Sequence, residues 1–339
     1  MRNSTAPFVT ALFVTAIISL AAPTFAADSP NPFIGNWALT IPGGAAGWLG
    51  VTESQGKLSG SILWGGGSVL PVEDIKLDGD SLVITRIHKG SRKSADVEPV
   101  VLTETITAKV DGDNLALTTV QSRPGKPDSA KVEFTGKLTP PLPPAPDLSQ
   151  VKFGPPITLF NGQNLDGWKL TDSKAANGWS VKEGILNNEV TQEPGKPHQH
   201  FGNLRTEQEF EDFNITVETN VPKSGNSGVY LRGIYEVQVF DSYGKPVDSH
   251  NMGAIYSRIT PTEAAEKPAG EWQTLDITLV DRHATVILNG KKIIDNQPLL
   301  GCTGGALWSD QLRPGPIYLQ GDHTGANFRN IVLRPVVKP

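Results

Sequence analysis

Residues 285–294 have the sequence TVILNGKKII, in which two β-prone runs flank the pair Asn289–Gly290. An Asn-Gly pair in this position favours a two-residue hairpin, because both central residues of a type I′ turn need positive φ. Around this hairpin, the second half of the chain contains further short β-prone runs, and none shows a long apolar stripe at helical spacing. The sequence therefore predicts an all-β fold there, an antiparallel sandwich of about a dozen strands with jelly-roll topology.

The first half of the chain predicts a smaller antiparallel β domain. Asp78–Gly79 and Asp111–Gly112 stand just before β-prone runs, as tight turns do in hairpins. The opening Gly35-Asn36-Trp37 and the succession of hairpins resemble lipocalin-like modules. A small antiparallel β domain is the expectation, and a lipocalin-like fold is what the resemblance implies for it.

Two stretches predict the domain boundaries. Residues 1–26 combine Arg2, an apolar run and small residues at the end, which is typical of a signal peptide cleaved after Ala26. Residues 139–150, TPPLPPAPDLSQ, cannot form a strand ladder and predict a semi-rigid linker. We thus expect an exported protein, periplasmic or extracellular, with domains at residues 27–138 and 151–339.

Composition excludes several partners. The chain has 30 Lys and Arg against 35 Asp and Glu, so it lacks the excess positive charge that nucleic acids select. No stretch beyond the signal peptide approaches the roughly 20 apolar residues of a membrane span. Cys302 is the single cysteine and cannot form a disulfide within the chain. We therefore expect a core held by packing alone. We expect the partner to be neither a nucleic acid nor a lipid bilayer.

Strand alternation predicts a polar groove in the second domain. Successive side chains of a strand point to opposite faces, so residues 229–240, taken as one strand, separate an apolar face from a polar one. Residues 213–220 and 317–322 divide in the same way, the latter placing Tyr318 beside polar residues. The polar side chains predicted to share the groove are Glu218, Arg232, Glu236, Gln238, Gln320 and Asp322. Such a groove suits sugars, whereas the alternative reading makes Arg232 and Glu236 an exposed ion pair.

Several segments of the second half, in order along residues 156–337, resemble one enzyme family. They include FNGQNLDGW at residues 160–168, NSGVYLRGIYEVQVFDSYG at residues 226–244 and GPIYLQGDHTGANFRNIVLRP at residues 315–335. These strings are similar to the bacterial 3-keto-disaccharide hydrolases, also described as 3-keto-glucoside 1,2-lyases and 3-keto-2-hydroxy-glucal hydratases. The resemblance implies a concanavalin-like jelly roll and action on sugars already oxidised at the 3-position. The first domain lies outside the resemblance.

The implied substrate gives the groove residues roles. A ketone at C3 acidifies the proton at C2, so a base can remove it and the anomeric substituent can leave by β-elimination, after which water adds. We expect Glu236 or His323 to transfer the proton and Arg232 to stabilise the developing charge. The residues expected to contact the oxidised mono- or disaccharide are Gln238, Gln320, Asp322, Tyr230, Tyr256 and Glu218.

Two alternatives remain open at the level of sequence. No cofactor is expected, but a divalent metal could be held by His198 and His200 together with His250, His323 or Asp241. The second alternative is a noncatalytic carbohydrate-binding protein, because lectins and enzymes share jelly rolls.

Overall fold

The computed structural model describes residues 31–89, 100–192 and 199–337, and the predicted signal peptide lies outside them. The described residues are all β, with no helix, and hence none long and apolar enough to cross a membrane. Residues Pro32–Pro339 form one compact unit. Within it we call residues 32–138 the first body and residues 151–337 the second body.

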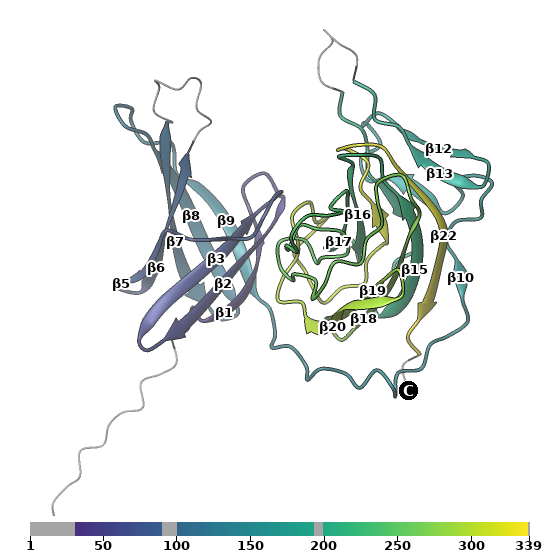
Figure 1. The fold of residues 1–339 in the computed structure, drawn as a ribbon. Helices are drawn as coiled ribbons and strands as arrows, with labels where there is room; N and C mark the ends of the chain where they lie inside the picture. Colours follow the sequence, from purple (N-terminus) through teal and green to yellow (C-terminus); the bar gives the residue numbers. More distant parts are fainter. Residues whose placement is uncertain (1–30, 90–99, 193–198, 338–339) are drawn as a thin grey trace, which may run out of the picture. The chain divides into compact units, whose positions relative to one another are not determined.

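One antiparallel sheet makes up the first body, with strand order β4-β3-β2-β1-β9-β8-β7-β6-β5 (Figure 1). Its nine strands are β1 Gly35–Thr40, β2 Ala46–Ser54, β3 Lys57–Trp64, β4 Leu70–Pro71, β5 Asp74–Asp78, β6 Ser81–Lys89, β7 Val101–Asp111, β8 Asn114–Ser122 and β9 Val132–Leu138. Strand β1 pairs with both β2 and β9, so the ends of the meander lie side by side. Trp37, Leu39 and Ile84 belong to the core on one face of this sheet. The lipocalin-like assignment stays a prediction.

Two antiparallel sheets make up the second body, and this confirms the predicted β-sandwich. The larger sheet has the order β12-β13-β22-β15-β18-β19-β20, with β10 also pairing with β22. Its strands are β10 Ile157–Thr158, β12 Trp179–Lys182, β13 Ile185–Asn188, β15 Phe213–Asn220, β18 Gln273–Val280, β19 His283–Leu288, β20 Lys291–Pro298 and β22 Ala326–Pro335. The smaller sheet, in order, is β11 Trp168–Leu170, β14 Leu204–Thr206, β21 Tyr318–Leu319, β16 Asn226–Leu231 and β17 Tyr235–Phe240.

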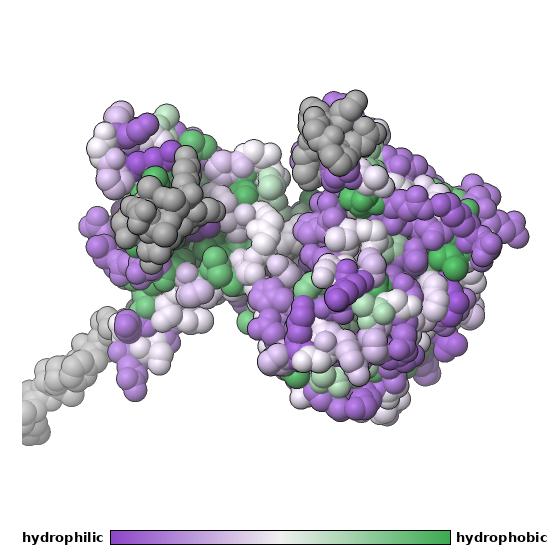
Figure 2. Space-filling model, turned by 45° about the horizontal axis from the view of Figure 1, so that its top comes forward, coloured by the Kyte–Doolittle hydropathy of each residue, from purple (hydrophilic) through white to green (hydrophobic). Residues whose placement is uncertain are grey.

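The predicted Asn289–Gly290 hairpin is confirmed as the β19–β20 turn, with φ of 51° and 83° at its two residues. The alternation predicted for residues 213–220 is confirmed in β15, where apolar side chains are buried and polar ones lie half exposed. The sandwich core therefore fills the space between the sheets, and hydrophilic side chains dominate the face of the molecule shown in Figure 2.

Strands β16, β17 and β21 of the smaller sheet are buried on both faces, and this positions the site. Val229 and Val237 pair across β16 and β17 and contribute to the sandwich core. The alternate residues Tyr230 and Glu236 also pair with each other and are 1% and 3% exposed. Polar side chains on this second face therefore lie in a covered interior and not on an open surface.

Between β9 and β10 the chain is held against the second body. The Arg282 guanidinium donates to the carbonyls of Pro140 and Pro141 at 3.0 and 2.7 Å. Asn296 Nδ2 donates to the carbonyl of Pro146 at 2.8 Å. Proline has no backbone N–H and cannot donate to a ladder, but its carbonyls accept these bonds and dock the segment.

Candidate functional site

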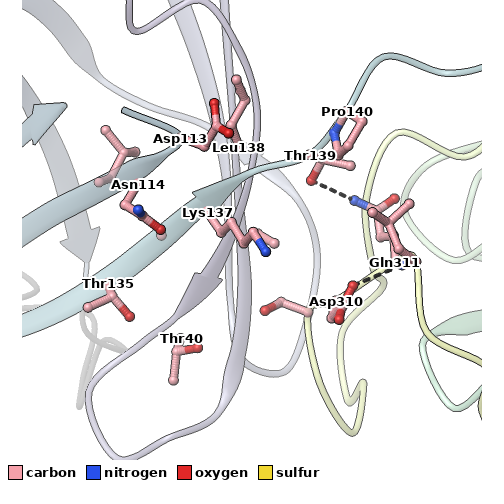
Figure 3. Close-up of a pocket in the computed structure, with 15 residues that line it drawn as sticks. Thr40, Asp113, Asn114, Thr135, Lys137, Leu138, Thr139, Pro140, Asp310 and Gln311 are labelled. Atoms are coloured by element: carbon pink, nitrogen blue, oxygen red, sulfur yellow. Dashed lines mark hydrogen bonds between the residues drawn. The ribbon is translucent and has the colours of Figure 1, made fainter. Parts of the chain in front are cut away.

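Several cavities are present, one of them about 660 Å³ in volume beside Asp212, and two others of different character bear on the functional site. The larger, a cleft of about 690 Å³, lies between β1, β8 and β9 and residues 309–312 (Figure 3). Its charged residues Asp113, Lys137 and Asp310 are all exposed. The smaller, about 210 Å³, contains the buried carboxyl of Glu236. Burial of an ionisable group in a polar pocket is the stronger sign of function, so the smaller cavity is the candidate site.

Three neighbouring strands bring the pocket residues to one face. Tyr230 of β16 pairs with Glu236 of β17 and, on its other side, with Tyr318 of β21. Gly228 pairs with Gln238, and a Cβ at Gly228 would meet Glu236 Oε1 at 2.4 Å. A glycine at this position therefore leaves the space that the Glu236 side chain occupies.

Glu236 is the central titratable group of the pocket. Tyr230 Oη lies 2.9 Å from its Oε2. The Gln238 amide nitrogen, in the orientation that satisfies its neighbours, donates to Glu236 Oε1 at 3.2 Å and to the Ser227 carbonyl at 3.0 Å. Burial raises the pKa of Glu236 to about 8, against the opposing effect of the Tyr230 hydrogen bond. Glu236 can therefore hold a proton near neutral pH.

A stacked tyrosine pair lies beside this carboxyl. The ring centroids of Tyr230 and Tyr318 are 3.8 Å apart, and the angle between the ring planes is 11°. Tyr230 Oη donates to the carbonyl of Gly304 at 2.7 Å, and Tyr318 Oη to that of Gly305 at 2.9 Å. Burial raises the pKa of both hydroxyls well above the usual value, so both remain protonated donors.

The pocket rim carries further polar groups. His323 Nδ1 lies 2.7 Å from Asp322 Oδ1, and this hydrogen bond raises the pKa of His323 against the effect of its partial burial. Gln320 Oε1 is buried and has no hydrogen-bond partner among the residues that the structure describes. An acceptor left free in a pocket is available to a ligand hydroxyl. Asn203 and Asn226 complete this polar side.

Most of the predicted site residues come together. Glu236, His323, Gln238, Gln320, Asp322, Tyr230 and Tyr256 all line the pocket. Their individual roles stay predictions, because geometry shows proximity and not chemistry.

Arg232 does not share the pocket, and the prediction that it lies on the Glu236 face is wrong. Residues 229–240 are not one strand but a hairpin that turns between Leu231 and Tyr235. Arg232 is in that turn with φ of 55°. Its buried guanidinium donates to the carbonyls of Gln311 and Arg313, so Arg232 tethers the 311–313 segment.

Glu218 is also placed apart from the pocket, because it belongs to the larger sheet of the sandwich. It lies on the half-exposed face of β15. Its carboxylate accepts from Arg329 Nε at 2.6 Å and from Asn330 Nδ2 at 3.0 Å. The interpretation of Glu218 as a groove residue is therefore wrong.

The residues proposed for a divalent metal are dispersed where they are described. His198 lies outside the described residues. His250 bonds to Asp248 and Ser68, and Asp241 accepts from the Ser224 amide. Within the described ranges, no group of three or more His, Cys, Asp or Glu side chains has metal-binding geometry.

Sequence reasoning missed several residues of the pocket. Alternation groups Tyr318 with Gln320, although the sequence predicts no role for its side chain. Gly304 and Gly305 come from a loop of the second body and accept the tyrosine hydroxyl bonds. Gly66 and Gly67 come from the first body, and no local pattern signals that they reach this site.

The residues of the pocket can bind a polar ring and exchange a proton with it. Comparison with known proteins bears on which ligand this is. A curated 3-keto-disaccharide hydrolase of Bacteroides thetaiotaomicron is 25% identical over 148 residues, which cover 36% of this chain and 51% of that protein. The match thus spans about half the length of that relative.

Two solved structures from Parabacteroides distasonis, each described as a proposed glycosyl hydrolase, are also similar. One is 29% identical with a TM-score of 0.45 and covers 59% of this chain and 94% of its own. The other is 26% identical with a TM-score of 0.39, and the match covers 54% of this chain and 100% of the other. The family model for the 3-keto-alpha-glucoside-1,2-lyase-like domain matches residues 155–334, more than half of the chain. The chain belongs to this family.

Proposed function

We propose that this protein is a carbohydrate-active enzyme that cleaves 3-keto-glycosides by elimination and rehydration. The observation that carries the proposal is Glu236, a buried carboxyl with a pKa of about 8 inside a polar pocket. A general base works best when its pKa lies near the operating pH. The family match supports the choice of substrate class.

The pocket size fits a single ring. Its 210 Å³ is smaller than the roughly 300–1,000 Å³ of pockets that enclose drug-sized ligands. We propose that the oxidised ring enters and that the anomeric substituent stays outside. The unpaired Gln320 Oε1 is then available to one of its hydroxyls.

The elimination follows from a carboxylate beside C2. The Glu236 carboxylate takes the C2 proton, and the electrons of the C–H bond form an enolate with the C3 ketone. The enolate then expels the anomeric oxygen, which breaks the C1–O bond and leaves a C1–C2 double bond conjugated with the ketone. Protonated His323, favoured by Asp322, supplies a proton to the departing oxygen. Neutral His323 then takes one proton of a water molecule as its oxygen adds at C1, and the enolate that re-forms takes the Glu236 proton at C2.

The developing charge on the ketone oxygen needs donors in a water-poor site. Arg232 is tethered elsewhere, so we assign this part to Tyr318, whose hydroxyl proton would shift from the Gly305 carbonyl to the ketone oxygen. The proposed reaction uses protein groups alone and no cofactor. From residues 1–26 we further propose export to the periplasm or beyond the cell.

Glu236→Gln tests the proposal with an aryl 3-keto-glucoside, by absorbance of the released aglycone. The variant keeps the size and hydrogen-bonding capacity of the side chain but cannot take a proton. We expect kcat to fall by about 10²–10⁴-fold. Glu218→Gln is the matched control, because that carboxylate lies on the half-exposed face of the larger sheet, and its kcat should not change. Undiminished turnover by the Glu236 variant, or binding without turnover by the wild type, contradicts the proposal.

A further inference from the structure

We propose that a glycine-rich loop of the first body, residues 65–68, forms one wall of the Glu236 pocket and restricts it to a single terminal oxidised ring. The inference deepens the proposed function and rests on it. The loop joins β3 to β4, and its residues Gly66 and Gly67 line the same cavity as Glu236 and Tyr318. The family match begins at residue 155 and does not include the loop.

The loop is fixed to the second body at both of its ends. Gly305 donates its N–H to the carbonyl of Gly65 at 3.3 Å. Ser68 Oγ lies 2.8 Å from His250 Nε2, and the N–H of Val69 donates to Ser257 Oγ at 2.9 Å. Bonds on both sides of Gly66 and Gly67 hold these residues in place over the pocket.

The backbone of the loop lies very close to Gly304, in the segment whose carbonyls accept the tyrosine hydroxyls. A Cβ at Gly304 would lie 2.1 Å from the carbonyl oxygen of Gly67, so only glycine permits this contact. The carbonyl of the same Gly304 accepts the Tyr230 hydroxyl. The loop therefore packs directly on the residue that orients Tyr230.

The wall presents peptide groups and no side chains. Gly66 and Gly67 on one strand connection face the same cavity as Gly304 and Gly305 on another. Asn, Gln, Asp and His side chains also line this cavity. A sugar ring fits between a thin backbone wall and a polar wall, whereas a ring with a further sugar attached on the glycine side would meet the loop. The substrate class is thus a glycoside whose oxidised ring is terminal.

Gly66 is the position at which this wall can be thickened. Gly65 and Gly67 have φ of 77° and 80°, but Gly66 is not among the positive-φ residues. No protein atom lies within 4 Å of a Cβ built on Gly66. Ala, Leu and Trp at this position therefore meet no protein atom at the Cβ and add volume to the wall in graded steps.

The series Gly66→Ala, Gly66→Leu and Gly66→Trp tests the wall with the aryl 3-keto-glucoside. We expect KM to rise in the order of side-chain volume, by about 10-fold or more for Trp, the scale on which one methylene discriminates in a pocket. Glu53→Trp is the control, because it puts the same side chain on an exposed position at the far end of the β2–β3 hairpin. Its KM should equal that of the wild type.

Binding to the Glu236→Gln protein supplies a readout independent of turnover. Calorimetric titration of that variant with the aryl 3-keto-glucoside should show weaker affinity once Gly66→Trp is added and no change once Glu53→Trp is added. Equal affinity and equal KM across the Gly66 series, in folded proteins with unchanged melting temperature, overturn the wall. Failure of the proposed function is distinct, since it appears as turnover that survives Glu236→Gln.

Discussion

At the scale of single residues, the contacts around Glu236 fit a protonated resting state. Tyr230 has one hydroxyl proton and two acceptors in range, Glu236 Oε2 and the carbonyl of Gly304. The carbonyl can only accept, so the Tyr230 proton satisfies Gly304 when Glu236 supplies the proton of the other contact. Ionisation of Glu236 draws the Tyr230 proton toward the carboxylate and leaves Gly304 short of a donor.

The pH dependence of turnover follows from this state. If the Glu236 carboxylate is the base and protonated His323 the acid, kcat/KM should give a bell-shaped pH profile with one limb at about 8, the pKa of Glu236. Tyr230→Phe removes a hydrogen bond that lowers this pKa, and should move the midpoint to higher pH. A pH series of initial rates measures both proteins. A pH profile without a limb near 8, or one that Tyr230→Phe leaves in place, would contradict the assignment of Glu236.

The same group should make stability depend on pH. The pKa of Glu236 is about 8 in the folded state and near 4.5 without the fold. Between pH 4.5 and 8 the folded state binds more protons than the unfolded one. The contribution of Glu236 to the free energy of unfolding is therefore complete below the lower pKa and is lost as pH rises toward the upper one. At about 1.4 kcal/mol per pKa unit, the loss reaches a few kcal/mol.

Urea unfolding at pH 5.5 and pH 9 measures this loss, since Gln at position 236 cannot ionise. We expect the free energy of unfolding of Glu236→Gln, relative to that of the wild type, to be higher at pH 9 than at pH 5.5. An equal stability difference at both pH values would show that burial does not perturb this carboxyl.

At the scale of elements, alternation predicted faces well but could not predict where the chain turns back. It placed Phe213, Ile215 and Val217 inward, and these residues of β15 are fully buried. It also put Glu236 and Gln238 on one face, but it assigned Arg232 to that face by counting through a turn. Arg232 and Gly233 have φ of 55° and 68°, which end the strand. Only the glycine signals this reversal in the sequence.

Connections between distant segments set a second limit on prediction. The turn at Asn289–Gly290 is a local signal, and it was confirmed. The carbonyls of Gly304 and Gly305, by contrast, reach the site through loop geometry, and loops carry no periodicity. Gly66 reaches it from another body altogether. Local spacing specifies which face a side chain occupies, whereas the pocket depends on contacts between residues hundreds of positions apart.

At the scale of the whole molecule, the two bodies share a hydrophobic core through β2 and β3. Leu49 and Ile62 pair across these strands and belong to the core of the first body. The next pair, Trp48 and Leu63, faces the other way and belongs to the core of the second body. Residues Ala46–Val51 are consequently buried on both faces.

Trp48 also supports the segment that holds the tyrosines. Its Nε1 donates to the carbonyl of Leu300 at 2.9 Å, and the Arg258 guanidinium lies 4.4 Å from its ring centroid. The same guanidinium donates to the carbonyl of Cys302 at 2.8 and 2.6 Å, two residues before Gly304. Trp48 thus connects the first body to the backbone that orients Tyr230 and Tyr318.

We therefore expect the wild type to unfold in one calorimetric transition and Trp48→Ala to separate it into two. Truncation of a buried Trp costs about 3–5 kcal/mol, and here the loss falls on the shared core. Trp64→Ala is the control, because Trp64 packs against the core of the first body alone. Its ring centroid lies 5.3 Å from that of Phe134. That variant should unfold at a lower temperature without separating the second body from its support. Two transitions in the wild type would show that the two bodies unfold separately. One transition in Trp48→Ala would show that Trp48 is not what couples them.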